Sequence, residues 1–242
     1  MNISLQGKRI LVTGATGGIG CRIAQTLQDS GAWVAGSYFK DEEKAAELRT
    51  RGLHLIQADL RDRSQARSLV AKALQEAGHL DSLVYCAGNT RDRLFATLSD
   101  EEWDEVIKLH VEGLVFSVQA LLPSMKERGA GTILSFTSMA GLTGRAGQAN
   151  YAAAKSAALG FIKTIAREMG RFGITANAVS PGFIDSKMTR QAPPEVWERA
   201  KADSVLGKVS SVETVASFTT WLLSDLAQGV TGQLFQLDSR IL

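Results

Sequence analysis

The sequence predicts an α/β fold in which a doubly wound, mostly parallel sheet of seven strands carries helices on both faces. Three observations predict it. Short apolar segments alternate with amphipathic helical segments along the chain. The first apolar segment leads through a glycine-rich turn directly into a helix. The 242 residues are 45% hydrophobic, which suits a single domain spanning residues 1–242 with an ample core.

Composition excludes several classes of protein. The formal net charge of +2 gives no reason to expect nucleic acid or a membrane surface as a partner. No apolar run approaches the length of a spanning helix and no leader segment precedes Leu5, so we expect a cytoplasmic protein. Two cysteines, Cys21 and Cys86, suggest no disulfide framework. The three histidines have no metal-ligand spacing, and we expect no metal site.

Residues 8–12 form the first predicted strand, and a helix follows from Gly18 to about Ser30. Between them, Gly14, Gly18 and Gly20 leave room for a pyrophosphate against the helix N-terminus, where free N–H groups favour an anion. This strand–turn–helix context predicts a Rossmann fold that binds a dinucleotide. Thr16 and Ile19 lie in the same turn and complete the predicted phosphate site.

The second strand, residues 33–37, ends where dinucleotide-binding folds distinguish their cofactors. A carboxylate at this point would bind the adenosine ribose and repel a 2′-phosphate. The sequence instead offers Ser37 and Lys40 as phosphate contacts, while Asp41 comes late enough to cap the next helix, residues 42–51. We therefore expect NADP(H) as the cofactor.

The remaining elements continue the alternation. Ser99 and the acidic residues that follow it mark the start of a long helix. Strands are predicted at residues 54–60, 81–88, 131–138, 173–183 and 234–237, and helices at residues 64–77, 99–128, 150–171 and 212–224.

Residues 138–155 contain the candidate chemistry. Tyr151 and Lys155 are four residues apart on a predicted helix and so share one face. A cation beside a phenol favours the phenolate, so the pair can exchange a proton with an alcohol or alkoxide. Ser138 ends a strand, where its hydroxyl can bind the same oxygen. A Tyr–Lys pair alone is weak support, because such pairs are common on helix surfaces.

The longer pattern resembles the short-chain dehydrogenase/reductase family, most closely its 3-oxoacyl-(acyl carrier protein) reductase branch. The residues that carry the resemblance are Thr13–Gly20, Ser138, Gly147–Lys155 and Pro181–Thr189, in the family's order and spacing. The resemblance implies that Tyr151 donates the proton, that Lys155 lowers its pKa and binds the ribose, and that Ser138 orients a substrate carbonyl.

The resemblance also implies contacts and assembly. Residues 186–207 would form a substrate lid. The helix after Tyr151 would pair across a two-fold axis into dimers or tetramers, since it is apolar almost all round. Asp59 would bind the adenine. The further implied cofactor contacts are Leu60, Ala87, Gly88, Tyr151, Lys155, Pro181, Gly182, Ile184 and Ser186.

Several positions depart from the family pattern. His110 stands where the family has a catalytic Asn whose helix kink holds a relay water; the relay here would use the main chain or the imidazole, or His110 only packs. Cys86 replaces an Asn that supports the sheet, and Phe172 replaces a basic residue that docks the carrier. The family's Asp-Gly-Gly tail reads Asp238-Ser239-Arg240 here.

The function implied by the resemblance is NADPH-dependent reduction of a 3-oxoacyl thioester on acyl carrier protein, in fatty acid or type II polyketide biosynthesis. A first alternative is an NADP-dependent dehydrogenase of a free small alcohol, sugar or steroid. A second is a non-catalytic nucleotide-binding subunit, suggested by the changes at His110 and Cys86.

Overall fold

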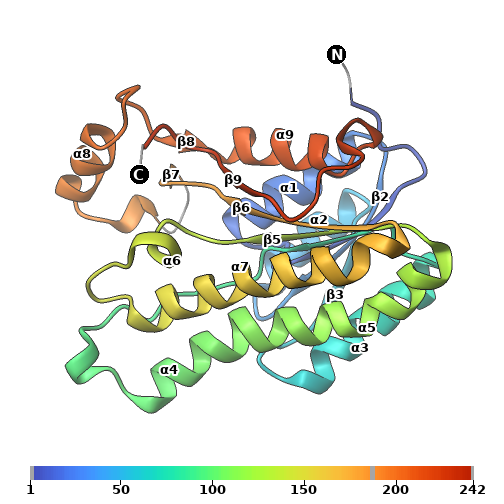
Figure 1. The fold of residues 1–242 in the computed structure, drawn as a ribbon, viewed down its shortest axis with the longest axis horizontal. Helices are drawn as coiled ribbons and strands as arrows, with labels where there is room; N and C mark the ends of the chain where they lie inside the picture. The colour runs from blue at the N-terminus through green and yellow to red at the C-terminus, as the bar shows by residue number, and fades with distance from the viewer. Residues whose placement is uncertain (1–2, 186–188, 241–242) are drawn as a thin grey trace.

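The computed structural model describes residues 3–185 and 189–240. It contains a seven-stranded sheet with the order β3-β2-β1-β4-β5-β6-β9, in which every pair of neighbours is parallel (Figure 1). The strands are β1 (Arg9–Thr13), β2 (Trp33–Tyr38), β3 (His54–Gln57), β4 (Ser82–Tyr85), β5 (Gly131–Phe136), β6 (Ile174–Ser180) and β9 (Leu234–Gln236).

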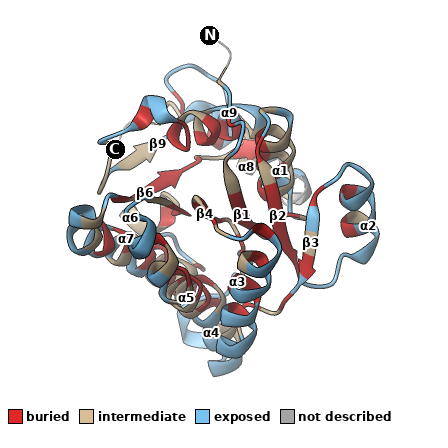
Figure 2. Ribbon diagram, turned by 90° about the vertical axis from the view of Figure 1, so that its right-hand side faces the viewer, coloured by how far each residue is buried: buried red, intermediate tan, exposed pale blue. Residues whose placement is uncertain are grey.

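Helices cover both faces of this sheet. On one face, α1 (Gly18–Asp29) packs beside α9 (Val212–Leu222); on the other lie α3 (Arg63–Ala77), α5 (Gly113–Arg128) and α7 (Ala149–Met169) (Figures 1 and 2). Outside the sheet, α2 (Glu42–Thr50) follows β2, and α4 (Asp100–Ile107) precedes α5. The predicted doubly wound architecture is confirmed.

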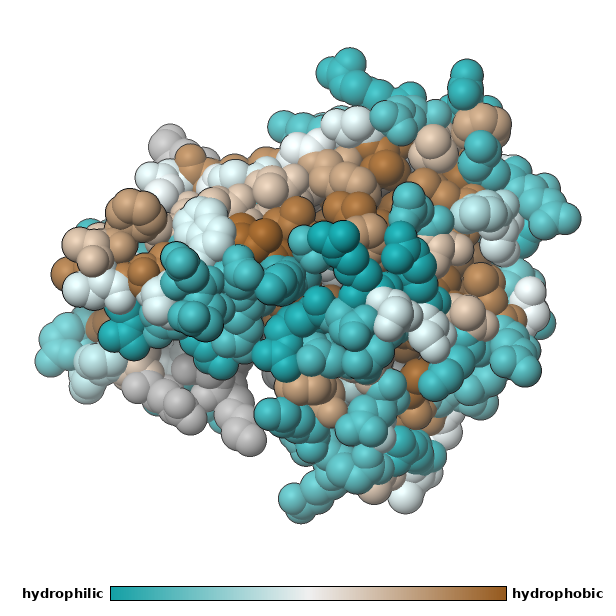
Figure 3. Space-filling view, turned by 90° about the horizontal axis from the view of Figure 1, so that it is seen from below, coloured by the Kyte–Doolittle hydropathy of each residue, from teal (hydrophilic) through white to brown (hydrophobic). Residues whose placement is uncertain are grey.

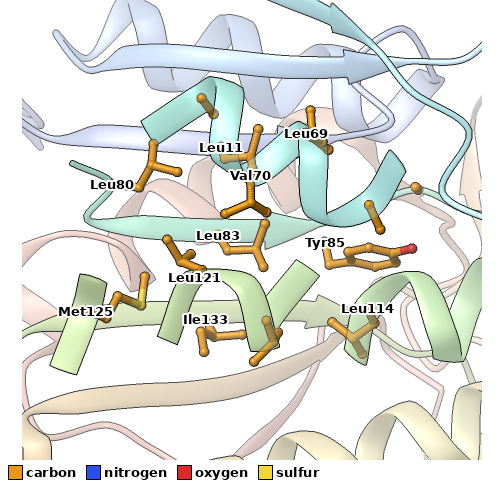
Figure 4. Packing of buried hydrophobic residues seen from close by; sticks show 14 of the residues in the cluster. Leu11, Leu69, Val70, Leu80, Leu83, Tyr85, Leu114, Leu121, Met125 and Ile133 are labelled. Carbon is orange, nitrogen blue, oxygen red and sulfur yellow. The ribbon is translucent and has the colours of Figure 1, made fainter. Parts of the chain in front are cut away.

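Two apolar layers hold the helices against the sheet. Leu69 and Val70 of α3 and Leu121 and Met125 of α5 meet strand residues such as Leu83, and all five side chains are at most 1% exposed (Figure 4). Burying a side chain of this size contributes about 1.5–3 kcal/mol relative to leaving it exposed. The second layer lies under α1 and α9 and includes Ile23 and Leu27. The central strands are buried on both faces and therefore contain short continuous apolar runs, whereas the edge strand β3 is exposed at both ends.

The order of the strands positions the site. The chain runs outward from β1 to β2 and β3, then returns to place β4 on the other side of β1. In open parallel sheets ligands bind outside the carboxyl ends of the strands where this order reverses. The glycine turn after β1 and the Ala87-Gly88 segment after β4 therefore share one edge of the sheet.

Several elements differ from the prediction. The predicted lid contains a 3₁₀ turn (Thr189–Gln191) and a helix, α8 (Pro194–Ala202), which forms because Pro194 occupies a first-turn position that needs no N–H. A short parallel sheet joins β7 (Ile184–Asp185) to β8 (Ser210–Ser211). A short helix that was not predicted, α6 (Ala140–Thr143), lies between β5 and α7.

The long helix predicted over residues 99–128 is present, but it is interrupted. A π-helical turn, Lys108–Glu112, separates α4 from α5. Ser99 and Glu102 form a capping box at its start, as the acidic N-terminal pattern indicates. Within the described part of the chain, Asp100–Arg128 is also one stretch with the length and mean hydropathy (1.3) of a membrane span, a test that core helices of soluble proteins pass as well.

Candidate active site

A pocket of about 720 Å³ opens at the carboxyl edge of the sheet. It extends from the glycine turn and the ends of β2 and β3 to the N-terminal half of α7. Its wall includes most of the residues predicted from sequence to bind the cofactor or react: Gly14, Thr16, Gly18, Ile19, Gly20, Ser37, Lys40, Asp59, Leu60, Ala87, Gly88, His110, Tyr151, Lys155 and Pro181.

The glycine turn has the shape of an anion cradle. Gly14 has a φ of +67°, and a Cβ there would stand 2.9 Å from the Ala87 Cα; a Cβ on Gly20 would collide with the Gly14 carbonyl oxygen. The N-terminus of α1 has no side-chain cap and no acid in its first turn, so its N–H groups face the pocket without a competing carboxylate. These residues fit a dinucleotide pyrophosphate.

Two buried hydroxyls fix the edges of this cradle. Ser37 Oγ accepts a hydrogen bond from the Gly14 N–H at 3.1 Å, so the side chain predicted to bind phosphate holds the glycine turn. Thr13 Oγ1 accepts from the N–H groups of Cys86 and Ala87 at 3.0 and 3.1 Å. Thr13 therefore ties β1 to the end of β4, where Cys86 offers no amide to do so. Sequence reasoning missed this role of Thr13.

Tyr151 and Lys155 line the inner wall of the pocket, whereas Ser138 lies outside the described lining, against the Tyr151 phenol. The Ser138 hydroxyl is hydrogen-bonded to the Tyr151 phenol. The Lys155 Nζ lies 5.5 Å from the centre of the Tyr151 ring and donates to the Phe136 carbonyl at 2.7 Å. The i, i+4 spacing on α7 therefore places phenol and ammonium together, as the helical pattern predicts.

Burial shifts the pKa values of both Tyr151 and Lys155. It raises the pKa of the Tyr151 phenol to about 12, although the hydrogen bond from Ser138 acts in the opposite direction. The same desolvation lowers the pKa of Lys155 to about 8, because a buried ammonium loses its water. The net shift of the Tyr151 pKa is therefore upward, and burial is its largest cause. Tyr151 is protonated at neutral pH, which suits a proton donor.

The start of α7 is anchored by Asn150, which is fully buried. Its side-chain amide donates to the carbonyls of Arg91 and Glu102 at 3.1 and 3.2 Å, and its Oδ1 accepts from the Tyr151 N–H at 2.8 Å. One side chain therefore joins α7, α4 and the segment after β4 beside the reacting phenol. Its place directly before Tyr151 in the sequence is the only signal that could have indicated this role.

His110 lies in the π-helical turn, and its ring stands edge-on to Tyr151 with a 5.3 Å separation of ring centres. Burial, reinforced by Lys155, lowers the pKa of the imidazole to about 3. Its Nε2 is 2.8 Å from the Asn89 carbonyl oxygen. A Cβ on Gly88 would stand 2.5 Å from the imidazole Cε1, so only glycine admits the ring there. A neutral imidazole held in this way does not titrate near neutral pH.

Comparison with known proteins agrees with this geometry. A family model described as enoyl-(acyl carrier protein) reductase matches residues 14–239. The 3-oxoacyl-[acyl-carrier-protein] reductase FabG of Staphylococcus aureus is 36% identical over 237 residues, which cover 96% of each chain. The chain belongs to the short-chain dehydrogenase/reductase family. FabG proteins of Thermotoga maritima and Salmonella typhimurium are each 36% identical, over 97% and 98% of both chains.

A solved structure, "Crystal structure of gox2181", shares the short-chain dehydrogenase/reductase fold with a TM-score of 0.92 at 28% identity, covering 98% of this chain and 96% of that one. The descriptions of the matches name two reactions. The description of the family model names an enoyl reductase, whereas the curated relatives reported above are named 3-oxoacyl reductases. The resemblance inferred from the motifs is confirmed at the level of the family.

The short-chain dehydrogenase/reductase pattern also implied contacts beyond β6. Pro181 lines the pocket, whereas Gly182 and Ile184 are outside the described wall. Gly182 has a φ of +81° and packs against Asp238, and Ile184 is buried in the core layer under α1 and α9. Ser186 lies outside the described residues.

At the end of β3, Asp59 is held by an arginine that sequence reasoning overlooked. Arg61 Nε and Nη2 donate to the Asp59 carboxylate at 2.9 and 2.7 Å, and Arg61 Nη1 donates to Glu105 at 3.2 Å. These bonds lower the pKa of Asp59. The carboxylate implied to bind adenine in the short-chain dehydrogenase/reductase family is thus already paired.

Neither cysteine is an activated nucleophile. Burial raises the pKa of Cys86, in the pocket wall, to about 12, although nearby Lys155 acts in the opposite direction. Desolvation likewise raises the pKa of the Cys21 thiol in the first turn of α1.

Proposed function

We propose that the protein is a cytoplasmic, NADPH-dependent ketoreductase that converts a 3-oxoacyl thioester on acyl carrier protein into the 3-hydroxyacyl thioester. The observation that carries this proposal is that Tyr151 and Lys155 line the same pocket as the glycine turn, with Ser138 beside the Tyr151 phenol. The names of the curated relatives, all 3-oxoacyl reductases over the full chain, support the substrate class. Fatty acid and type II polyketide synthesis both contain this reaction.

Each residue of the site then has its own role in the proposed reaction. The bound nicotinamide supplies the hydride. Ser138 orients the substrate carbonyl oxygen, and Tyr151, protonated because burial raises its pKa, donates its proton to that oxygen. The Lys155 ammonium stabilises the phenolate left behind, in a buried site where a charge acts strongly. Lys155 also has N–H groups beyond the one on the Phe136 carbonyl for the ribose hydroxyls.

The segment after Pro181 contains the proposed substrate lid. We propose residues 186–207 as the lid over the substrate, with α8 as its body. Trp197 of α8 stacks edge-on against Phe183 with a ring separation of 5.1 Å, and its Nε1 donates to the Thr189 carbonyl at 3.1 Å. These contacts hold α8 against the segment that follows β6.

The deciding experiment measures NADPH oxidation with three substrates: an acetoacetyl thioester on acyl carrier protein, a free small ketone and a crotonyl thioester. The proposal expects the acetoacetyl thioester to give by far the highest kcat/KM. A preference for the free ketone would establish the alternative, a dehydrogenase of free alcohols, sugars or steroids. A preference for the crotonyl thioester would favour enoyl reduction, which the description of the family model names. No turnover with any substrate would favour a non-catalytic subunit.

NADPH should be preferred over NADH. No carboxylate ends β2, and Lys40 lies at the pocket wall where a 2′-phosphate would be placed. A charge-assisted contact of this kind contributes roughly 1.5–3 kcal/mol, or about ten- to a hundredfold in kcat/KM. Steady-state kinetics with the two cofactors measures the ratio, and Lys40→Ala should reduce it. Equal kcat/KM values for NADPH and NADH would contradict the assignment.

His110→Asn should keep or raise kcat. The imidazole is neutral, and we expect the π-helical turn to persist without it, so that a main-chain carbonyl would hold the relay water. The measurement is kcat together with the melting temperature, and His110→Ala is the companion variant. If the imidazole itself moved protons, His110→Asn would lower kcat and alter the pH profile. A large loss of kcat with unchanged folding would refute the main-chain relay.

The protein should form at least a dimer. The face seen from below carries an apolar band bordered by hydrophilic side chains (Figure 3). Leu159 and Phe161 of α7 and Phe116 of α5 pack against the core but remain partly exposed. Burying such a surface against a second copy stabilises a dimer. Light scattering at micromolar concentration tests this, and a stable monomer would contradict it.

A further inference from the structure

Two cations share one aromatic ring at the outer end of the pocket. Phe39, the residue after β2, is 39% exposed. The Lys40 Nζ and the Arg61 guanidinium carbon each lie 4.9 Å from the centre of its ring, so the two charges are within twice that distance of each other. All three residues line the pocket. Two segments far apart in the sequence thus bring positive charge to one place.

The Arg61 side chain is fixed in position but has donors to spare. A guanidinium carries five N–H groups. Asp59 accepts from Nε and Nη2, and Glu105 accepts from Nη1, which accounts for three of the five in the described part of the chain. One N–H remains on each Nη atom. Two carboxylates therefore orient the guanidinium at little entropic cost and leave two neighbouring donors for a ligand.

The chemistry of that position favours a phosphate monoester. Adjacent N–H donors on a guanidinium match two phosphate oxygens, whereas a neutral hydroxyl would use only one. The glycine turn offers no cation of its own, since Gly17 stands between Thr16 and Gly18. A dianion at the end of β2 would thus meet Lys40 from one strand and Arg61 from the next.

We propose that Arg61 is a cofactor-specificity residue that binds the 2′-phosphate of NADP(H) together with Lys40, with Asp59 holding its guanidinium in place. This inference rests on the proposed use of NADP(H) and adds the residue that distinguishes the phosphate. It predicts that Arg61 matters for cofactors that carry the phosphate and not for those that lack it.

Isothermal titration calorimetry with 2′,5′-ADP and 5′-ADP tests this without turnover. Arg61→Ala should weaken 2′,5′-ADP binding by about tenfold to a hundredfold and leave 5′-ADP binding nearly unchanged. Arg63→Ala is the matched control. It removes the same charge two residues further along the chain, and the Arg63 side chain is exposed and pairs with Glu112. Arg61→Lys, which keeps the charge without the paired donors, should fall between wild type and Arg61→Ala.

The outcomes separate the two proposals. A wild-type protein that binds both nucleotides equally would overturn the NADP(H) assignment itself. A strong preference for 2′,5′-ADP that survives in Arg61→Ala would overturn only the role of Arg61. Equal weakening of both nucleotides, or equal effects of Arg61→Ala and Arg63→Ala, would also overturn it. Melting temperatures of each variant show that it is folded, and Arg61→Lys provides the comparison if Arg61→Ala does not fold.

Discussion

Tyr151→Phe should reduce kcat for ketone reduction by about 10²–10⁴-fold, the usual contribution of a positioned general acid. The substitution removes one oxygen and leaves the ring, which packs edge-on against His110, in place. It removes the proton donor and the partner of the Ser138 hydroxyl together. Because only the proton donor is removed, the affinity for NADPH should barely change. Stopped-flow turnover and NADPH fluorescence titration measure the two quantities separately.

The matched control is Tyr38→Phe. Tyr38 also lines the pocket, but its hydroxyl bonds Glu42 and Arg49 at the edge of α2, away from the reacting groups. This variant should keep kcat. Substantial turnover in Tyr151→Phe would show that another group supplies the proton. A parallel loss of NADPH binding would show that the hydroxyl serves the cofactor instead.

The sequence sufficed to predict the architecture because each prediction rested on a local pattern. The glycine turn requires a strand before it and a helix after it, and the central strands contain short apolar runs, such as Ile10–Val12 in β1. The i, i+4 spacing of Tyr151 and Lys155 fixes their relative placement once the segment is helical. The capping residues Asp41 and Ser99 start their helices through side-chain bonds to the nearby backbone. None of these requires knowledge of distant contacts.

The features that sequence reasoning missed depend on distant contacts. Arg61 acquires its place only when β3 lies beside β2 and α4 supplies Glu105. Asn150 donates to two carbonyls that lie 59 and 48 residues earlier in the chain. The upward shift of the Tyr151 pKa could not be predicted, because the burial that causes it is not visible in the sequence.

Lys155→Met should give a protein that is nearly inactive and yet more stable. Removing the ammonium withdraws the charge that stabilises the Tyr151 phenolate, a loss of about 10²–10³-fold in kcat if it resembles other single electrostatic contacts. The stability gain arises because the ammonium is buried, with 7% of the residue exposed. Its pKa falls from 10.5 to about 8 on folding, which costs the native state about 3 kcal/mol.

The Phe136 carbonyl would lose its donor in this variant, a cost of about 1–2 kcal/mol that pocket water can partly offset. The net gain is therefore about 1–2 kcal/mol at pH 7, or a rise of several °C in the melting temperature. Lys163→Met, an exposed lysine on the same helix, is the control and should change neither activity nor stability much.

The stability gain of Lys155→Met should also depend on pH. Below about pH 8 the lysine is protonated in both the folded and the unfolded wild type, so the full cost of the buried charge is present. Between about pH 8 and 10.5 the unfolded wild type binds more protons than the folded one, so wild-type stability rises with pH relative to the variant. Urea unfolding at pH 7 and pH 10 should show that the difference in the free energy of unfolding between Lys155→Met and wild type is smaller at pH 10. A gap that stays constant with pH would show that Lys155 is not desolvated in the native state, and that the gain has another origin.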